Sequence, residues 1–264
     1  MLKVAILASG SSGNCLVVSD GCTHLLLDAG ISARRITTGL KGLGIDPAEL
    51  AGILITHEHS DHISGLAVLC RQIGVDLYAT EPTAQQVCQR TAELGERFCV
   101  FAPGERFAVG NLIVGGFAVS HDCAQPVGYH VGDGTAKMAL CTDLGVVTGE
   151  VLSGVKGCHL LVGEFNHDAD LLRTGPYPAQ LKERVLGDRG HLSNEAGASL
   201  AAQCVQWGAN RVVMAHMSQE NNRISLARTA AERAFECIGA MVGRDVRLEA
   251  AARSEPGPWW EVEV

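Results

Sequence analysis

The segment from Thr56 to His62, with the sequence T-H-E-H-S-D-H, concentrates side chains that bind divalent metal ions. Imidazole and carboxylate groups together suit zinc, manganese or iron. The candidate ligands in this segment are His57, His59, Asp61 and His62. One tetrahedral ion rarely takes so many ligands from a single loop, so the segment predicts two ions. A solvated polar turn is the alternative, but histidines gathered this densely are costly without a metal.

Three later residues are candidate ligands because each stands where an apolar run ends. His121 follows LIVGGFAVS, Asp143 follows MALCT, and His216 follows RVVMA. A ligand at the end of a strand is held by a rigid element. Each residue alone would more often be structural, but their shared context with the histidine-rich segment favours a common site.

Hydrophobic periodicity places the histidine-rich segment between a buried strand at 52–56 and a helix at 62–73. Further strands are expected at 3–8, 15–19, 24–28, 76–80, 106–109, 112–119, 127–131, 136–142, 158–163, 211–215 and 245–249. Further helices are expected at 32–43, 82–94, 178–187, 193–208 and 225–239. The pattern indicates an α/β protein with a single domain over residues 1–264. Two strand-rich halves with helices outside suggest a four-layer αββα sandwich.

Composition limits the class of protein and its compartment. The ten cysteines are scattered with no C-x-x-C pair, which indicates buried thiols in a reducing compartment and excludes a cysteine-based zinc ribbon. No segment has the length of a signal peptide or of a membrane span, so we expect a cytoplasmic protein with no membrane partner. The net charge of −8 argues against broad, non-specific binding of nucleic acid but leaves room for a local basic face. The oligomeric state is not predicted.

The pattern H-x-H-x-D-H resembles the signature of the metallo-β-lactamase superfamily. This resemblance implies the four-layer αββα fold and two divalent metal ions per chain, either zinc or manganese, with iron as a third option. It also implies how the ligands divide between the ions: His57, His59 and His121 on the first metal, Asp61, His62 and His216 on the second, and Asp143 bridging both.

A closer resemblance extends over nearly the whole chain. It is carried by A-S-G-S-S-G-N-C at 8–15, D-A-G at 28–30, T-D-L-G at 142–145, N-H-D at 166–168, G-H-L-S-N at 190–194 and A-H-M-S-Q-E-N-N at 215–222. These motifs resemble the small bacterial exonuclease-like branch called YycJ or WalJ, which is associated with 5′-to-3′ degradation of DNA. Their order is also similar to that of the transfer-RNA 3′-processing endonucleases. The resemblance therefore implies hydrolysis of phosphodiester bonds by a hydroxide held between two metals, with DNA as the expected substrate.

His191 and Glu164 are the candidates for proton transfer. In the endonuclease-like relatives the matching histidine protonates the leaving oxygen, and a glutamate orients that histidine. Glu164 ends the apolar run CHLLVG and would match this glutamate. The resemblance also lets Asp61 orient the attacking water. The alternative for His191 is a loop histidine that serves only in a turn.

Several polar residues near these motifs are candidates for binding substrate or supporting the ligands. The small residues of the loop 9–14, including Ser11, Ser12 and Asn14, could hold a phosphate, although by composition alone a plain hairpin loop is favoured. Ser193 and Asn194 are candidates for contacting substrate and for capping the following helix. Asp28 either supports a metal-binding histidine or serves only in the turn before Gly30.

Two other functions stay open from the sequence. Small-molecule hydrolases of this fold cleave thioesters, lactones or β-lactams with the same metal motif, but they do not require the G-H-L-S-N element. A metal-bound regulator or nucleic-acid binding module without turnover is the second alternative, and the intact set of candidate ligands argues against it.

Overall fold

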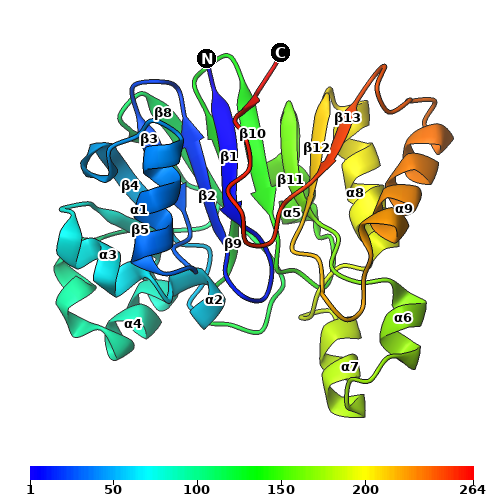
Figure 1. Cartoon of the computed structure of the whole chain (residues 1–264), viewed down its shortest axis with the longest axis horizontal. Coiled ribbons are helices and arrows are strands. Elements are labelled where there is room, and N and C mark those ends of the chain that lie inside the picture. Colours follow the sequence, from blue (N-terminus) through cyan, green and yellow to red (C-terminus); the bar gives the residue numbers. More distant parts are fainter.

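The aliphatic runs expected as strands form two seven-stranded sheets in a computed structural model that describes residues 1–264 (Figure 1). The first sheet has the order β14-β1-β2-β3-β4-β5-β6 and the second β13-β12-β11-β10-β9-β8-β7. The strands of the first sheet are β1 Lys3–Ala8, β2 Cys15–Ser19, β3 His24–Leu27, β4 Leu50–Leu54, β5 Leu77–Thr80, β6 Phe98–Phe101 and β14 Trp260–Glu261. Those of the second are β7 Arg106–Val109, β8 Leu112–Ala118, β9 Val127–Gly132, β10 Lys137–Cys141, β11 Leu160–Glu164, β12 Arg211–Ala215 and β13 Arg247–Ala250.

Both sheets change from antiparallel to parallel pairing in the same way along the chain. In the first sheet β1, β2 and β3 pair antiparallel, and β3 to β6 pair parallel. In the second sheet β7 to β10 pair antiparallel, and β10 to β13 pair parallel. Parallel neighbours need long crossover connections, and these connections supply most of the helices.

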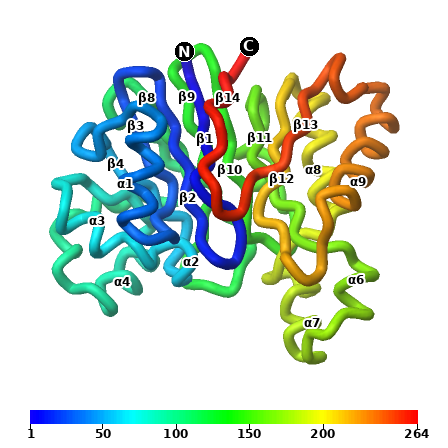
Figure 2. Tube along the Cα trace, in the orientation of Figure 1, coloured from blue at the N-terminus to red at the C-terminus, as the bar shows by residue number.

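The helices lie outside the two sheets, and one pair projects from the molecule (Figures 1 and 2). The elements that follow strands of the first sheet are α1 Ala33–Gly42, η1 Pro47–Glu49, α2 Ser60–Ile63, α3 Leu66–Gln72, α4 Glu81–Arg90 and η2 Ala92–Arg97. The second sheet carries α5 Gly149–Val155, α8 Asn194–Gln206 and α9 Ile224–Cys237. The projecting pair, α6 Ala169–Thr174 and α7 Ala179–Leu186, is called the arm here.

Three buried clusters hold these layers together. A cluster of 25 residues includes Val4, Val114 and Val213, so it fills the space between the two sheets. A cluster of 23 residues packs the first sheet against its helices, and one of 26 residues packs the second sheet against α5, α8 and α9. The layers are therefore helix, sheet, sheet and helix, which confirms the predicted αββα sandwich.

The helix expected at 62–73 is interrupted, because its hydrogen bonds are diverted to other loops. The Gly65 amide donates to the Ala29 carbonyl at 2.8 Å, whereas the Asp61 carbonyl accepts from the Asn14 amide at 2.8 Å. A Cβ atom on Gly65 would lie 2.0 Å from the Ile31 carbonyl oxygen, so this close approach requires glycine. The interruption ties the histidine-rich segment to the loops that follow β1 and β3.

Five short elements were not expected from the sequence, namely η1, β6, α5, α6 and β14. None has more than seven residues, which is too short for a clear hydrophobic period. No helix in the structure combines the length and the apolar character that crossing a bilayer requires.

Candidate metal centre

The histidine-rich segment leaves β4 and is fixed by the carboxylate of Asp28. One oxygen of Asp28 accepts from the Thr56 amide at 2.8 Å, and the other lies 2.7 Å from Nδ1 of His62. The Thr56 hydroxyl lies 3.0 Å from Nδ1 of His57. With their Nδ1 atoms engaged, His57 and His62 turn their Nε2 atoms toward the cluster, which is the usual arrangement of metal-binding histidines. Nε2 of His57 has no partner, whereas Nε2 of His62 lies 3.0 Å from the side-chain amide of Asn14.

The later histidines are oriented in the same way by the second sheet. Nδ1 of His121 donates to the Gly190 carbonyl at 3.1 Å, and Nδ1 of His216 lies 2.9 Å from Oε1 of Glu164. Asp143 lies between them, with its Oδ1 atom 3.4 Å from Nε2 of His216 and 4.0 Å from Nε2 of His121. Ends of strands from both sheets thus meet at one point.

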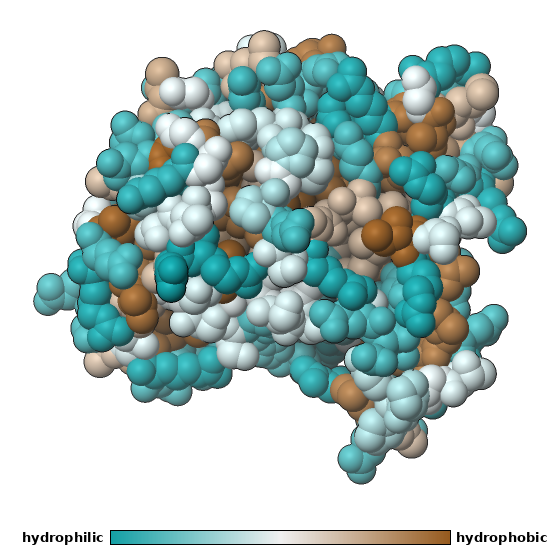
Figure 3. Space-filling view, viewed as in Figure 1, coloured by the Kyte–Doolittle hydropathy of each residue, from teal (hydrophilic) through white to brown (hydrophobic).

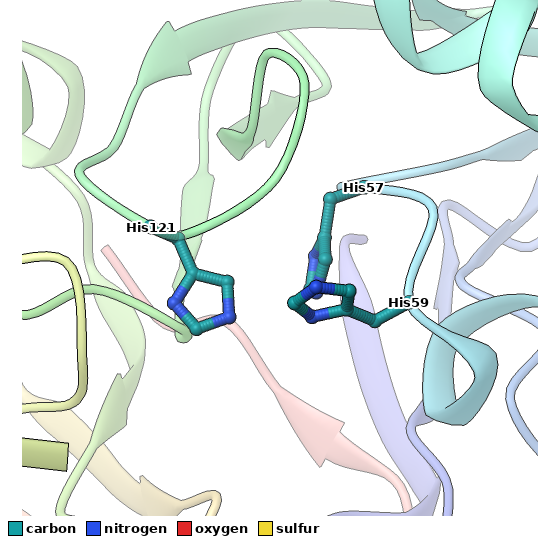
Figure 4. A group of neighbouring side chains, drawn as sticks. All are labelled: His57, His59 and His121. Atoms are coloured by element: carbon teal, nitrogen blue, oxygen red, sulfur yellow. The ribbon is translucent and has the colours of Figure 1, made fainter. Parts of the chain in front are cut away.

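The seven predicted ligands fall into groups whose possible ligand atoms lie within 4.8 Å of one another. One group contains His57, His59 and His121, whose rings converge from two loops in Figure 4. The other groups are Asp61, His62 and His216, then Asp143 with His57 and His62, and then Asp143 with Glu164, His191 and His216. Asp143 is therefore close to ligands of both predicted ions.

Unpaired polar atoms show that this cluster fits a metal. Nε2 of His57, Nε2 of His216 and Oδ2 of Asp143 are buried and have no hydrogen-bond partner. Buried polar atoms are almost always paired, because an unpaired one costs about 1–3 kcal/mol. Bound divalent cations would give these atoms partners, and imidazole with carboxylate is a donor set that such cations accept. This donor set supports the use of divalent metal.

The charges of the cluster also favour cations. Burial alone would raise the pKa of Asp143, but His216 and His62 outweigh it and hold the pKa well below its usual range. Burial would lower the pKa of His62, yet Asp28 and Asp143 raise it to about 9. Asp143 likewise raises the pKa of His216 to about 10 against the effect of burial. Metal binding would replace protons held in this way, so it should release protons.

Backbone strain occurs at three residues of this centre. Asp28, Asp143 and His216 have φ angles of 59°, 59° and 54°, and they are the only non-glycine residues with positive φ. Such conformations cost of the order of 1–3 kcal/mol each and persist where the surroundings enforce them. Each of the three residues comes one or two positions after a strand, and the left-handed turn directs its carboxylate or imidazole toward the cluster.

Glu164 contacts two rings, whereas the sequence predicted contact with His191 alone. Its Oε1 atom lies 2.8 Å from Nδ1 of His191 and 2.9 Å from Nδ1 of His216. Its Oε2 atom accepts from the amides of Leu144 and Leu192 at 3.0 and 3.2 Å. Burial raises the pKa of Glu164, but His191 and His216 outweigh it and bring the pKa to about 2. The carboxylate therefore positions both the candidate proton donor and a candidate metal ligand.

The residues predicted to bind substrate in the first loop lie in different surroundings. Ser11 lines a cavity beside His191 and His216, whereas Ser12 is exposed and does not line it. Asn14 is buried, with its amide nitrogen 3.0 Å from Nε2 of His62. The amides of this loop are partly used internally, since the Gly10 amide donates to Oδ1 of Asn14 at 2.8 Å.

The residues after His191 are engaged in structure. The Ser193 hydroxyl accepts from the Ala196 amide at 3.2 Å and so caps α8. Asn194 is 1% exposed, and its amide makes two reciprocal hydrogen bonds with Asn222 at 2.9 and 2.8 Å. Asn194 is therefore buried and does not line the cavity beside His191.

Two residues to which the sequence analysis gave no role in the site adjoin the predicted ligands. Oδ1 of Asp122 lies 3.4 Å from Nε2 of His121, and its Oδ2 accepts from Nε of Arg184 at 2.6 Å. The side-chain amide of Asn166 donates to the His216 carbonyl at 2.9 Å. The signals in the sequence were the position of Asp122 next to His121 and the place of Asn166 at the start of the N-H-D motif at 166–168.

Comparisons with known proteins agree with this geometry. A family model described as "Beta-lactamase superfamily domain" matches residues 23–217. The chain is 38% identical over 244 residues to "Exodeoxyribonuclease YycJ" of Bacillus anthracis, with 92% of each chain covered. It is 36% identical over 264 residues to "Exodeoxyribonuclease WalJ" of Streptococcus pneumoniae, with 98% of each chain covered.

A solved structure shows the same fold at low sequence identity. The metallo-β-lactamase fold protein YhfI from Bacillus subtilis superposes with a TM-score of 0.75 at 16% identity. The superposition covers 99% of this chain and 100% of the YhfI chain. At this identity the likeness concerns the fold alone.

Proposed function

We propose that this chain, which belongs to the β-lactamase superfamily, is a metal-dependent exodeoxyribonuclease that acts in the cytoplasm. The observation that carries the proposal is the match to two proteins named as exodeoxyribonucleases, each over more than nine-tenths of both chains. The placement of His191 and Glu164 beside the candidate metal ligands supports it further. The ten free cysteines are in keeping with a reducing compartment.

The proposed cofactors are two divalent ions per chain, zinc or manganese. Two trios of candidate ligands with Asp143 close to both support this number. His57, His59 and His121 would hold the first ion, Asp61, His62 and His216 the second, and Asp143 would contact both. When bound, such ions activate water and offset negative charge on the phosphate. Elemental analysis of fully loaded protein should approach two ions per chain, and saturation at one would contradict the proposal.

The proposed role of His191 is to donate a proton to the departing sugar oxygen. Because Glu164 engages Nδ1 at 2.8 Å, Nε2 is the ring nitrogen left to face substrate. The side chain of His191 is 19% exposed, so it can reach a bound phosphodiester from the cavity. Glu164 fixes the ring and its tautomer. Asp61, with a side chain 24% exposed, would orient the attacking water.

The experiment compares His191→Ala with the wild type on two substrates. A sugar alkoxide is a poor leaving group and needs a proton, whereas p-nitrophenolate leaves readily without one. We therefore expect the rate on end-labelled DNA to fall by about 10²–10⁴, and the rate on bis-p-nitrophenyl phosphate to fall much less.

Metal content is the control in this experiment, because His191 is not a proposed ligand and the variant should keep both ions. Equal losses on the two substrates with metal retained would exclude the leaving-group role. Wild-type protein that hydrolyses thioesters or lactones and leaves DNA labelled at either end uncut would refute the nuclease proposal itself.

A further inference from the structure

The arm faces the metal centre across a cavity of about 170 Å³ whose two sides differ in chemistry. His191 and His216 line one side, and Tyr177 and Leu181 of the arm line the other. Figure 3 shows the arm standing out from the body of the molecule at the lower right, with the surface hollowed beside it. The proposed chemistry uses only the histidine side and leaves the arm side without a role.

We propose that this cavity binds the terminal nucleobase of an unpaired DNA end, with Tyr177 as the stacking residue. The inference rests on the proposed nuclease function and goes beyond it, because that function alone does not say how an end is recognised. It assigns the arm to substrate binding and names single-stranded ends as the substrate class.

Tyr177 is well suited to stacking because its backbone is held on both sides. It lies between Pro176 and Pro178 in the loop that joins α6 to α7. Proline fixes its own φ angle and also restricts the residue before it, so the loop loses little entropy when a ligand binds. Tyr177 is half-buried, and Leu181 in the first turn of α7 gives the same cavity an apolar lining. Stacking of a base on an aromatic ring tolerates any sequence, as an exonuclease requires.

Asn221 supplies an unpaired polar group at the same cavity. It is 1% exposed, it lines the cavity, and its Oδ1 atom has no hydrogen-bond partner. A Cβ atom on Gly175 would lie 2.8 Å from this oxygen, so glycine leaves the approach to it open. An unpaired buried carbonyl oxygen is costly, and a donor from a ligand would remove that cost. Every nucleobase carries at least one N–H group that could donate to it.

The size of the cavity favours one base over a base pair. Sites for drug-sized ligands usually measure about 300–1,000 Å³, and this cavity is smaller than that range. Its arm side is linked to the metal centre, because Arg184 of α7 donates to Asp122 at 2.6 Å beside His121. A paired end would therefore have to open before its last base could enter, at a cost of a few kcal/mol.

The test measures stacking directly with 2-aminopurine, a fluorescent base that is quenched when it stacks. Metal-loaded protein is mixed with single strands that carry 2-aminopurine at the 5′ end, at the 3′ end or in the middle. A phosphorothioate at each terminal linkage slows cleavage during the measurement. The variants are Tyr177→Leu, which loses the ring, and Tyr177→Phe, which keeps it.

We expect quenching at one end and little in the middle of the strand. Tyr177→Leu should abolish this quenching and weaken binding about 5-fold or more, whereas Tyr177→Phe should match the wild type. Equal metal content and equal unfolding midpoints would establish that both variants fold.

Three outcomes would overturn the inference. If the wild type degrades DNA but quenches neither end, or if Tyr177→Leu still quenches, the base does not stack on Tyr177 and the nuclease function stands. If the wild type degrades no DNA, the proposed function fails and this inference fails with it.

Discussion

Replacing Glu164 by glutamine should weaken metal binding as well as catalysis. The carboxylate has four partners: the rings of His191 and His216 on Oε1, and the amides of Leu144 and Leu192 on Oε2. All four partners can donate a hydrogen bond. A glutamine amide has a single oxygen, so its NH₂ group must face one of these two pairs of donors.

The size of the effect follows from the two hydrogen bonds that glutamine cannot make. Glu164 is 0% exposed, so water cannot replace them. Hydrogen bonds to charged groups contribute about 1.5–3 kcal/mol each, so the free energy of unfolding of metal-free protein should fall by about 3 kcal/mol or more. Loss of a partner that orients a metal-binding histidine typically weakens metal affinity by about 10- to 100-fold. Because His216 is the affected ligand, we expect the second ion to bind more weakly.

The assay is a metal titration of Glu164→Gln by competition with a chelator, together with urea unfolding. Glu58→Gln is the matched control. Glu58 is also buried in the metal-binding region, but its Oε1 atom accepts only from the Ala124 amide at 2.8 Å, and glutamine can keep that bond. Metal affinity within about 3-fold of the wild type for both variants would refute the reasoning, since a loss of hydrogen-bonded orientation should exceed that.

Two further predictions concern packing and pH. Gly30→Ala should destabilise the protein by about 3 kcal/mol or more, because the added Cβ atom would lie 1.6 Å from the Asp61 carbonyl oxygen. The control, Gly42→Ala, places its Cβ atom more than 4 Å from any other atom and should be neutral or slightly stabilising. Equal unfolding midpoints for the two variants would contradict this prediction. Burial, together with the charges of Lys137 and Arg106, lowers the pKa of His130 from 6.5 to about 4. The unfolded chain therefore binds a proton at His130 more readily than the folded protein does. The stability that this residue contributes above pH 6.5 should be lost as the pH falls toward 4. His130→Gln should reduce that loss in urea unfolding curves measured at pH 7 and pH 5, and identical losses in variant and wild type would exclude His130 as the cause.

The fold could be predicted from the sequence because aliphatic runs and turn residues are local signals. The histidine-rich segment and the residues that end three later apolar runs could be identified for the same reason, and the structure brings these residues together. Contacts between distant segments carry no such signal. The left-handed backbone at Asp28, the second contact of Glu164 and the link from Asp122 to Arg184 all depend on such contacts.

Part of the arm is too short to be predicted from hydrophobic periodicity. Its helix α6 has six residues, and the loop with Tyr177 between two prolines resembles an ordinary turn. Only the cavity shared with His191 gives the loop a possible role. Asn194 illustrates the opposite case, because a polar residue beside the candidate proton donor proved to be buried against Asn222.

The joining of two sheets at one metal cluster has a consequence for the order of events as the protein is made. His57 and His62 follow β4 of the first sheet and are synthesised early. His216 follows β12 of the second sheet and is synthesised much later. The complete set of ligands therefore exists only after the two sheets have docked, and we expect metal capture to be a late step. Interactions that form after the transition state slow unfolding and leave the folding rate nearly unchanged. Bound metal would then slow the unfolding of the folded protein, and the supply of metal would affect the lifetime of the folded state more than the rate of folding.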